Sequence, residues 1–367
     1  MALQCGIVGL PNVGKSTIFN ALTGAGAAAA NYPFCTIDPN VGVVALEDAR
    51  MAQLAAIAKS EKILPTTVEF VDIAGLVKGA SQGEGLGNQF LSHIRAVDAV
   101  VHVVRCFEDP DVVHVHGKID PAEDVQVIHL EFVLADLEIV EKRLERVAKN
   151  AKIAGNVDAQ VEHACFARVV AGLRAGTPVR RMQFSADELP FVQQAQLLTA
   201  KPMLYAANLS ETDIRHPENC VAFQRLREIA AADGGHVIPL CGKLEAEISE
   251  LSPEDRTTFL AEVGLTESGL NRLARTTYGL LGLVTYFTTG PKETRAWTIT
   301  RGTLAPAAAG KIHSDLERGF IRAETYHCDD LFAHGSEAAL RAKGLIRQEG
   351  REYPVKDGDV LFIKFNV

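Results

Sequence analysis

The stretch that decides the fold is Gly9-Leu10-Pro11-Asn12-Val13-Gly14-Lys15-Ser16-Thr17. A short apolar run, residues 3–8, comes before it, and residues 17–22 take up helical spacing after it. This order of strand, loop and helix is the context in which the pattern G-x-x-x-x-G-K-[ST] forms a phosphate-binding loop. Its glycines let backbone N–H groups turn toward phosphate oxygens at the N-terminus of the helix. We therefore expect this loop to bind the phosphates of a nucleoside triphosphate.

The side chains of the loop add contacts of their own. Lys15 is expected to bring a positive charge to the β- and γ-phosphates, and it is the first candidate catalytic residue. The hydroxyl of Ser16 is expected to be a ligand of Mg²⁺. The predicted phosphate-binding residues are Asn12, Val13, Gly14, Lys15, Ser16 and Thr17.

A second motif fits the same chemistry. The apolar strand at residues 68–72 ends in the D-x-x-G arrangement of GTPase-type sites, formed by Asp72 and Gly75. In such sites the aspartate holds Mg²⁺ through water, and the glycine N–H contacts the γ-phosphate. Thr36, in the loop between the two motifs, is expected to complete the metal shell.

The residue after D-x-x-G is a glutamine in Ras-like enzymes, where it orients the attacking water. Here it is Leu76, whose side chain neither donates nor accepts a hydrogen bond. Water must then be positioned from elsewhere, or hydrolysis is slow and awaits an activator. His93 is the nearest titratable candidate downstream. The alternative interpretation of His93 is a half-buried helix histidine without a catalytic role.

The base-recognition motif of GTPases is also altered. Such sites use N-K-x-D after a strand, and the aspartate accepts both N–H groups of the guanine edge. Here the apolar strand at residues 202–207 runs into Asn208-Leu209-Ser210-Glu211. Leu209 removes the lysine stem that packs over the base, and Glu211 is one methylene longer than aspartate. Because a site that loses this pairing leaves guanine unsatisfied, we expect ATP to be preferred over GTP.

Composition excludes several classes of protein. The chain of 367 residues is 47% hydrophobic and 23% charged, and it has no apolar run long enough to cross a membrane. The first residues lack the features of a secretory signal. Seven scattered cysteines are typical of reduced thiols in the cytosol. The net charge of −9 argues against indiscriminate binding of nucleic acid by the whole surface.

The middle of the chain has a helical pattern. Apolar residues recur at spacings of three and four from Leu130 to Ala151, Gly155 interrupts the pattern, and a second stripe runs from Val157 to Leu173. This predicts an antiparallel helical hairpin inserted between strands of the nucleotide domain. Off the seam lie basic residues that are candidates either for contact with rRNA phosphates or for a solvated face: Lys142, Arg143, Arg146, Lys149 and Lys152.

The last part of the chain changes to short strands. Residues 297–299 and 360–365 have strand patterns and bracket a helix expected near residues 307–316. We therefore expect a small β-grasp unit there.

Residues 9–17, 31–40, 72–80 and 208–211 together closely resemble the Obg-like ATPase (YchF) family of translation-factor (TRAFAC) class P-loop proteins. The match continues through residues 290–298 to motifs at 309–313, 319–324 and 355–359, so it covers nearly the whole chain. The resemblance implies an ATPase with a G domain, a helical hairpin insertion and a C-terminal TGS domain. Members of this family associate with the ribosome and have been tied to stress responses.

The resemblance also implies roles for single residues. It gives Ser16 and Thr36 to Mg²⁺ and makes Leu209 the contact to adenine. The histidine that the family conserves falls on His93. Asn12 stands where potassium-stimulated relatives place a ligand of K⁺, so K⁺ is a second hypothetical cofactor.

The sequence thus predicts an α/β fold: a P-loop NTPase G domain with an inserted antiparallel helical hairpin and a C-terminal β-grasp (TGS) domain. The expected bounds are 1–129 with 196–281 for the G domain, 130–195 for the insertion and 282–366 for the TGS domain. The expected function is hydrolysis of ATP to ADP and phosphate, together with binding to the large ribosomal subunit that couples nucleotide state to translation or stress regulation. The alternative is a nucleotide-sensing adaptor that regulates a protein partner, with hydrolysis incidental. We expect a cytoplasmic monomer without membrane contact.

Overall fold

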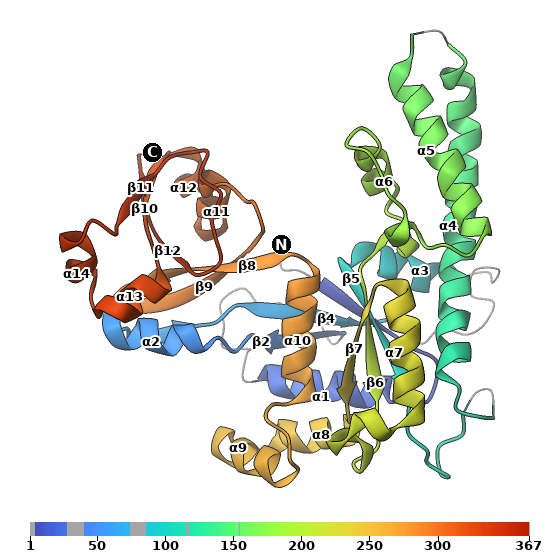
Figure 1. Cartoon of the computed structure of the whole chain (residues 1–367), viewed down its shortest axis with the longest axis horizontal. Helices are drawn as coiled ribbons and strands as arrows, with labels where there is room; N and C mark the ends of the chain where they lie inside the picture. The colour runs from blue at the N-terminus through green and yellow to red at the C-terminus, as the bar shows by residue number, and fades with distance from the viewer. Residues whose placement is uncertain (1–3, 28–39, 74–85, 115–116, 154, 367) are drawn as a thin grey trace. The chain divides into compact units, whose positions relative to one another are not determined.

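The computed structural model describes residues 4–27, 40–73, 86–114, 117–153 and 155–366. The described chain divides into two compact units (Figure 1). Of these residues, the first unit contains those up to 273 except for 43–68, and the second contains 43–68 and those from 274 onward. Among the helices that the structure describes, none is both long and apolar enough to cross a membrane.

One six-stranded sheet has the strand order β2-β4-β1-β5-β6-β7, and its strands β1, β5, β6 and β7 lie wholly in the first unit. The neighbours β4, β1, β5, β6 and β7 pair in parallel. Every residue of β5 and β6 is buried, as expected of parallel strands that are covered on both faces. The strands are β1 (Gln4–Val8), β2 (Val41–Ala45), β4 (Thr67–Asp72), β5 (Ala99–Arg105), β6 (Met203–Asn208) and β7 (His236–Leu240).

Helices cover this sheet, and two pairs of them pack on one another: α1 against α8, and α4 against α7. Helix α7 ends where Gly234 adopts a left-handed conformation with φ 73°, which is a common way to end a helix. The longer helices of this unit outside the hairpin are α1 (Lys15–Ala27), α3 (Leu86–Ala96), α7 (Val221–Asp233), α8 (Gly242–Glu250), α9 (Pro253–Glu262) and the start of α10 (Gly269–Leu280).

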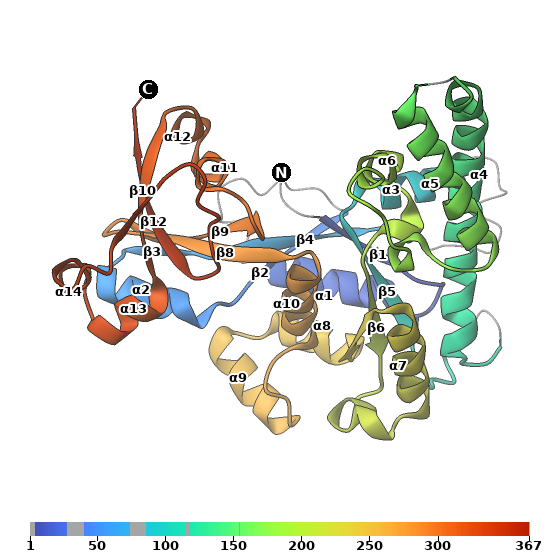
Figure 2. The ribbon, with the colours of Figure 1, turned by 45° about the horizontal axis from the view of Figure 1, so that its top comes forward.

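The predicted helical hairpin is present as α4 (Pro121–Ala151) and α5 (Val157–Arg174), which lie side by side in both views of the ribbon (Figures 1 and 2). Their shared core includes Val140, Phe166 and Val169. Helix α4 begins at Pro121, earlier than the predicted seam, because Asp120 caps it by accepting a hydrogen bond from the backbone of Ala122 at 3.1 Å.

The first position of the predicted seam is wrong. Leu130 is 51% exposed, whereas its neighbour Phe132 is fully buried. Helix α4 packs on β5 and α7 as well as on α5, so its buried residues do not all face the hairpin partner. After α5 the chain passes through three short helices before it reaches β6: η2 (Val179–Arg181), α6 (Leu189–Ala195) and η3 (Leu198–Ala200).

The base of the hairpin is fixed by a buried carboxylate. Asp136 of α4 is fully buried and accepts hydrogen bonds from the backbone N–H groups of Leu198 and Thr199 at 2.9 and 2.8 Å. It also accepts one from the Thr199 hydroxyl at 2.7 Å. Burial raises the pKa of Asp136, although these hydrogen bonds oppose the shift.

The second unit is built on a separate six-stranded sheet with the order β11-β10-β12-β8-β9-β3. Strands β10, β11 and β12 pair antiparallel, as do β8 and β9, whereas β12 with β8 and β3 with β9 are parallel. The strands are β3 (Lys62–Leu64), β8 (Leu283–Thr289), β9 (Glu293–Thr300), β10 (Phe320–His327), β11 (Arg347–Glu349) and β12 (Asp359–Phe365).

Two apolar cores lie on this second sheet. One contains Tyr286 and Leu361 with Ala308 and Ala309 of α11, and the other contains Phe287 with Leu54 of α2. The helices of the unit are α2 (Ala49–Ala58), α11 (Ala305–Ile312), α12 (Ser314–Arg318), α13 (Cys328–His334) and α14 (Glu337–Ala342). The α/β sheet, the helical hairpin and the C-terminal β unit that the sequence predicts are therefore confirmed.

Candidate nucleotide-binding site

The carboxyl ends of four parallel strands deliver four loops to one cavity of about 970 Å³. This is the edge at which open α/β sheets bind their ligands. The loops follow β1, β5, β6 and β7, and the cavity lining includes residues 10–12 and 14–17, 107–109 and 112, 208–212, and 241–243. The fold thus brings together the phosphate motif and the altered base motif, which are almost 200 residues apart in the sequence.

The phosphate loop has the backbone geometry that its glycine pattern predicts. Asn12 and Gly14 both adopt left-handed conformations, with φ of 63° and 88°. Such turns aim successive N–H groups into a concave site for anions, and asparagine tolerates this conformation better than most residues. The Nδ2 atom of Asn12 also donates to the carbonyl oxygen of Val113 at 3.1 Å, which ties this loop to the one after β5. Val13 is only 1% exposed, so its side chain packs inside the unit and not in the cavity.

Asn208, at the end of β6, links the two halves of the site. Its Nδ2 atom donates to the carbonyl oxygen of Val13 at 2.9 Å, and its Oδ1 atom accepts from the backbone N–H of Gly242 at 2.9 Å. The residue is only 4% exposed. A Cβ atom on Gly14 would lie 2.2 Å from this Nδ2, so both the positive φ and the carboxamide require glycine there. Asn208 therefore holds the phosphate loop and the start of α8 together.

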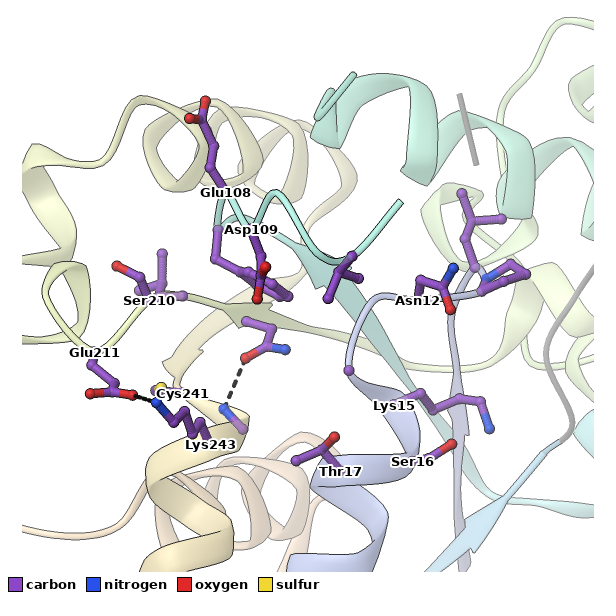
Figure 3. A pocket seen from close by; sticks show the side chains of 18 of the residues that line it. Asn12, Lys15, Ser16, Thr17, Glu108, Asp109, Ser210, Glu211, Cys241 and Lys243 are labelled. Atoms are coloured by element: carbon purple, nitrogen blue, oxygen red, sulfur yellow. Dashed lines mark hydrogen bonds and ion pairs between the residues drawn. The ribbon is translucent and has the colours of Figure 1, made fainter. Parts of the chain in front are cut away.

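The charged groups of the phosphate end lie close to one another. The ammonium of Lys15 contacts the carboxylate of Asp72, the last residue of β4. The two side chains are 11% and 24% exposed, so this pair is partly shielded from solvent. Ser16 and Thr17 are exposed in the first turn of α1, and both line the cavity (Figure 3).

The base end lies on the other side of the cavity from Lys15 and Ser16 (Figure 3). Leu209 is 2% exposed and lines this end, and its N–H donates to the carbonyl oxygen of Leu240 at 2.8 Å. Glu211 forms an ion pair with Lys243, the second residue of α8. The hydrogen bond with Glu211 raises the pKa of Lys243.

Some predicted site residues are not brought to this cavity by the described structure. His93 is exposed on α3 and is not among the residues that line the cavity. Thr36, Gly75 and Leu76 lie outside the described residues. Their proposed roles therefore remain predictions.

Sequence reasoning missed the loop after β5. Phe107, Glu108 and Asp109 line the cavity, together with Val112. The loop is held by Arg105, which is 2% exposed and donates to the carbonyl oxygens of Phe107, Val112 and Asp109 at 3.1, 2.9 and 3.3 Å. An arginine at the end of a fully buried central strand was the available signal, because such a side chain needs several acceptors nearby.

The glycine-rich loop lies between a central parallel strand and a helix, and it is held to a base-end loop at the carboxyl edge of the sheet. These features define an α/β P-loop protein with a site of the G-domain type. Residues 4–143 match the family model MMR_HSR1, described as "50S ribosome-binding GTPase". Residues 283–366 match YchF-GTPase_C, described as "Protein of unknown function (DUF933)".

Full-length relatives narrow this class. Proteins named "Ribosome-binding ATPase YchF" from Bacillus subtilis (strain 168) and Escherichia coli O157:H7 are each 52% identical over 367 residues, covering 100% of both chains. The "Structure of the Schizosaccharomyces pombe YchF GTPase" is 38% identical with a TM-score of 0.90, and it covers 99% of this chain and 97% of that one. The chain belongs to the YchF family. The two relatives at 52% identity are named as ATPases, whereas the solved structure at 38% identity is named as a GTPase.

Proposed function

We propose that this chain is an ATPase that binds ATP in preference to GTP, hydrolyses it to ADP and phosphate, and binds the ribosome through its large subunit. The observation that carries the proposal is the base end of the cavity. There a buried leucine replaces the lysine of N-K-x-D, and the carboxylate that follows is engaged by an ammonium group.

Guanine recognition needs an acceptor that is free to take both N–H groups of the base edge. Glu211 stands at the position of that acceptor, but its carboxylate is bound by Lys243. Leu209 offers only apolar contact, which suits either purine face. Since buried polar groups that stay unpaired cost about 1–3 kcal/mol each, guanine is disfavoured and adenine is tolerated. The curated relatives named as ribosome-binding ATPases support the same choice.

The phosphate end is suited to a magnesium-bound triphosphate. Ser16 and Thr36 are the proposed direct ligands of Mg²⁺, and Asp72 is proposed to act through water. Oxygen donors of this kind are those that Mg²⁺ prefers. The contact between Lys15 and Asp72 supports the assignment, because it puts the phosphate-binding cation next to the metal-side carboxylate. When bound, Mg²⁺ neutralises charge on the β- and γ-phosphates. A K⁺ ion held by Asn12 remains a further proposal.

Turnover is proposed to be slow without an activator. Leu76 has no group with which to orient water, so the remaining candidate is His93, and Lys15 stabilises the charge that develops on the phosphates. His93 is exposed on α3 and lies outside the cavity lining, so its role rests on the sequence alone.

Ribosome contact is proposed for the hairpin of α4 and α5. The proposed domain bounds are 130–195 for the insertion and 1–129 with 196–281 for the G domain. Exposed cations lie along the C-terminal half of α4 and at the residue that caps its end: Lys142, Arg146, Lys149 and Lys152. Lys142 pairs with Glu138, but the other three form no ion pair within the described part of the chain. Their charge is therefore available for phosphates of rRNA. The TGS domain proposed at 282–366 is a second candidate contact, and the protein is proposed to act as a cytoplasmic monomer.

Two measurements test the proposal. Phosphate release from ATP and from GTP, with Mg²⁺ present, gives the substrate preference directly. Co-sedimentation with ribosomes, with and without ATP and at raised salt, tests the partner. Hydrolysis without ribosome binding in any nucleotide state would favour the adaptor alternative, in which the partner is another protein.

A further inference from the structure

The ion pair between Glu211 and Lys243 joins two loops that belong to different strands. Glu211 lies in the loop after β6, and Lys243 lies in the first turn of α8, after β7. Both side chains line the base end of the cavity, and the pair is drawn there as a dashed contact (Figure 3).

We propose that Lys243 is a specificity-determining residue that disfavours GTP by holding the carboxylate of Glu211. This inference rests on the proposed function, since it explains the preference for ATP at the same site. Glu211 follows Asn208 at the spacing of the aspartate in N-K-x-D. A free carboxylate at this place accepts hydrogen bonds from the two N–H groups of guanine. The ammonium of Lys243 holds this carboxylate by one oxygen, so the carboxylate is less free to turn both oxygens toward the guanine edge, and guanine leaves donors unpaired.

The position of the pair sets the size of the effect. The side chains of Glu211 and Lys243 are 46% and 72% exposed, so water and salt screen their attraction. Exposed pairs of this kind correspond to a change of about two- to fivefold in an equilibrium constant. Lys243 therefore adjusts the preference, whereas Leu209 and the longer side chain of Glu211 provide the rest of it. At high salt the contribution of Lys243 is expected to fall.

The test is equilibrium competition of ATP and of GTP against a fluorescent ATP analogue, with Mg²⁺ and the full chain. In Lys243→Met, the ratio of the GTP to the ATP dissociation constant is expected to fall about two- to fivefold. Lys243→Arg keeps the positive charge and is expected to keep most of the ratio. Lys118→Met is the matched control, because Lys118 is 67% exposed, pairs with Asp120 at 3.3 Å and lies outside the cavity lining.

A second substitution tests whether Lys243 acts through the carboxylate. In a Glu211→Gln background, Lys243→Met is expected to produce no further change in the ratio, because the group that it restrains is gone. An unchanged ratio in the single variant, or an equal loss of affinity for both nucleotides, overturns the inference. If the unmodified protein binds neither nucleotide, the proposed function itself fails, which is a different result from binding with an unchanged ratio.

Discussion

Asn208 is the residue through which the structure makes its sharpest prediction. The residue is 4% exposed, and its carboxamide makes two hydrogen bonds of 2.9 Å, to Val13 and Gly242. Replacement by alanine leaves a buried carbonyl oxygen and a buried N–H group without these partners. Each unsatisfied group costs about 1–3 kcal/mol, so we expect the first unit to lose about 2–6 kcal/mol of stability.

The same substitution is expected to weaken nucleotide binding, because the phosphate loop and the start of α8 are no longer held in register. If ATP binding must supply about 1.4 kcal/mol to bring the phosphate loop back into its bound geometry, the affinity for ATP falls about tenfold. Denaturant unfolding and fluorescent-nucleotide titration measure the two effects separately. Asn208→Asp keeps an acceptor for Gly242 but faces the Val13 carbonyl oxygen with a carboxylate, so it should be at least as harmful.

Asn219→Ala is the control for this prediction, since Asn219 is exposed in the short helix η5 (Pro217–Asn219). The bridging role of Asn208 is refuted if Asn208→Ala unfolds within about 0.5 kcal/mol of the unmodified protein and binds ATP within about twofold of its affinity.

Three further predictions concern other parts of the chain. Exchange of His93 for alanine is expected to lower turnover on the order of a hundredfold at near-normal ATP affinity, and unchanged turnover would remove it from the mechanism. His102 is fully buried, neither ring nitrogen has a partner among the described residues, and burial followed by repulsion from His129 lowers its pKa to about 3. The unfolded chain binds a proton at His102 below about pH 6.5 and the folded chain does not, so the free energy of unfolding falls as the pH falls. We therefore expect His102→Leu to raise the free energy of unfolding by about 1.4 kcal/mol more at pH 5.5 than at pH 7.5. An equal effect at both pH values in denaturant unfolding would contradict this. A variant with Arg146→Gln, Lys149→Gln and Lys152→Gln neutralises the unpaired hairpin cations. The slope of log affinity against log salt concentration in ribosome co-sedimentation should become shallower by about two units, and an unchanged slope would show that the contact lies elsewhere.

The parts of the fold that sequence reasoning predicted are those with local signals. The phosphate loop is defined within nine consecutive residues, and the hairpin is defined by a helical repeat that each helix carries on its own. The early start of α4 was also readable, because Asp120 followed by Pro121 is a typical N-terminal signal. The apolar repeat that predicts the seam begins only at Leu130, nine residues after Pro121.

Long-range contacts could not be predicted in the same way. Strand β3 has only three residues, and its pairing of Lys62 with Glu293 joins segments more than 200 residues apart. Residues 43–68 therefore cluster with the second unit, although the domain bounds expected from the sequence put them in the G domain. The pairing of Glu211 with Lys243 is a similar case, since the fold alone brings the two loops together.

The central claim is that the base end of the cavity accepts adenine and disfavours guanine. The most direct test is equilibrium competition of ATP and GTP for the full chain with Mg²⁺ at one salt concentration. The structure predicts that ATP displaces a bound fluorescent analogue at a concentration about tenfold or more below that of GTP. Tighter binding of GTP than of ATP would contradict the account of the base end and the function proposed from it.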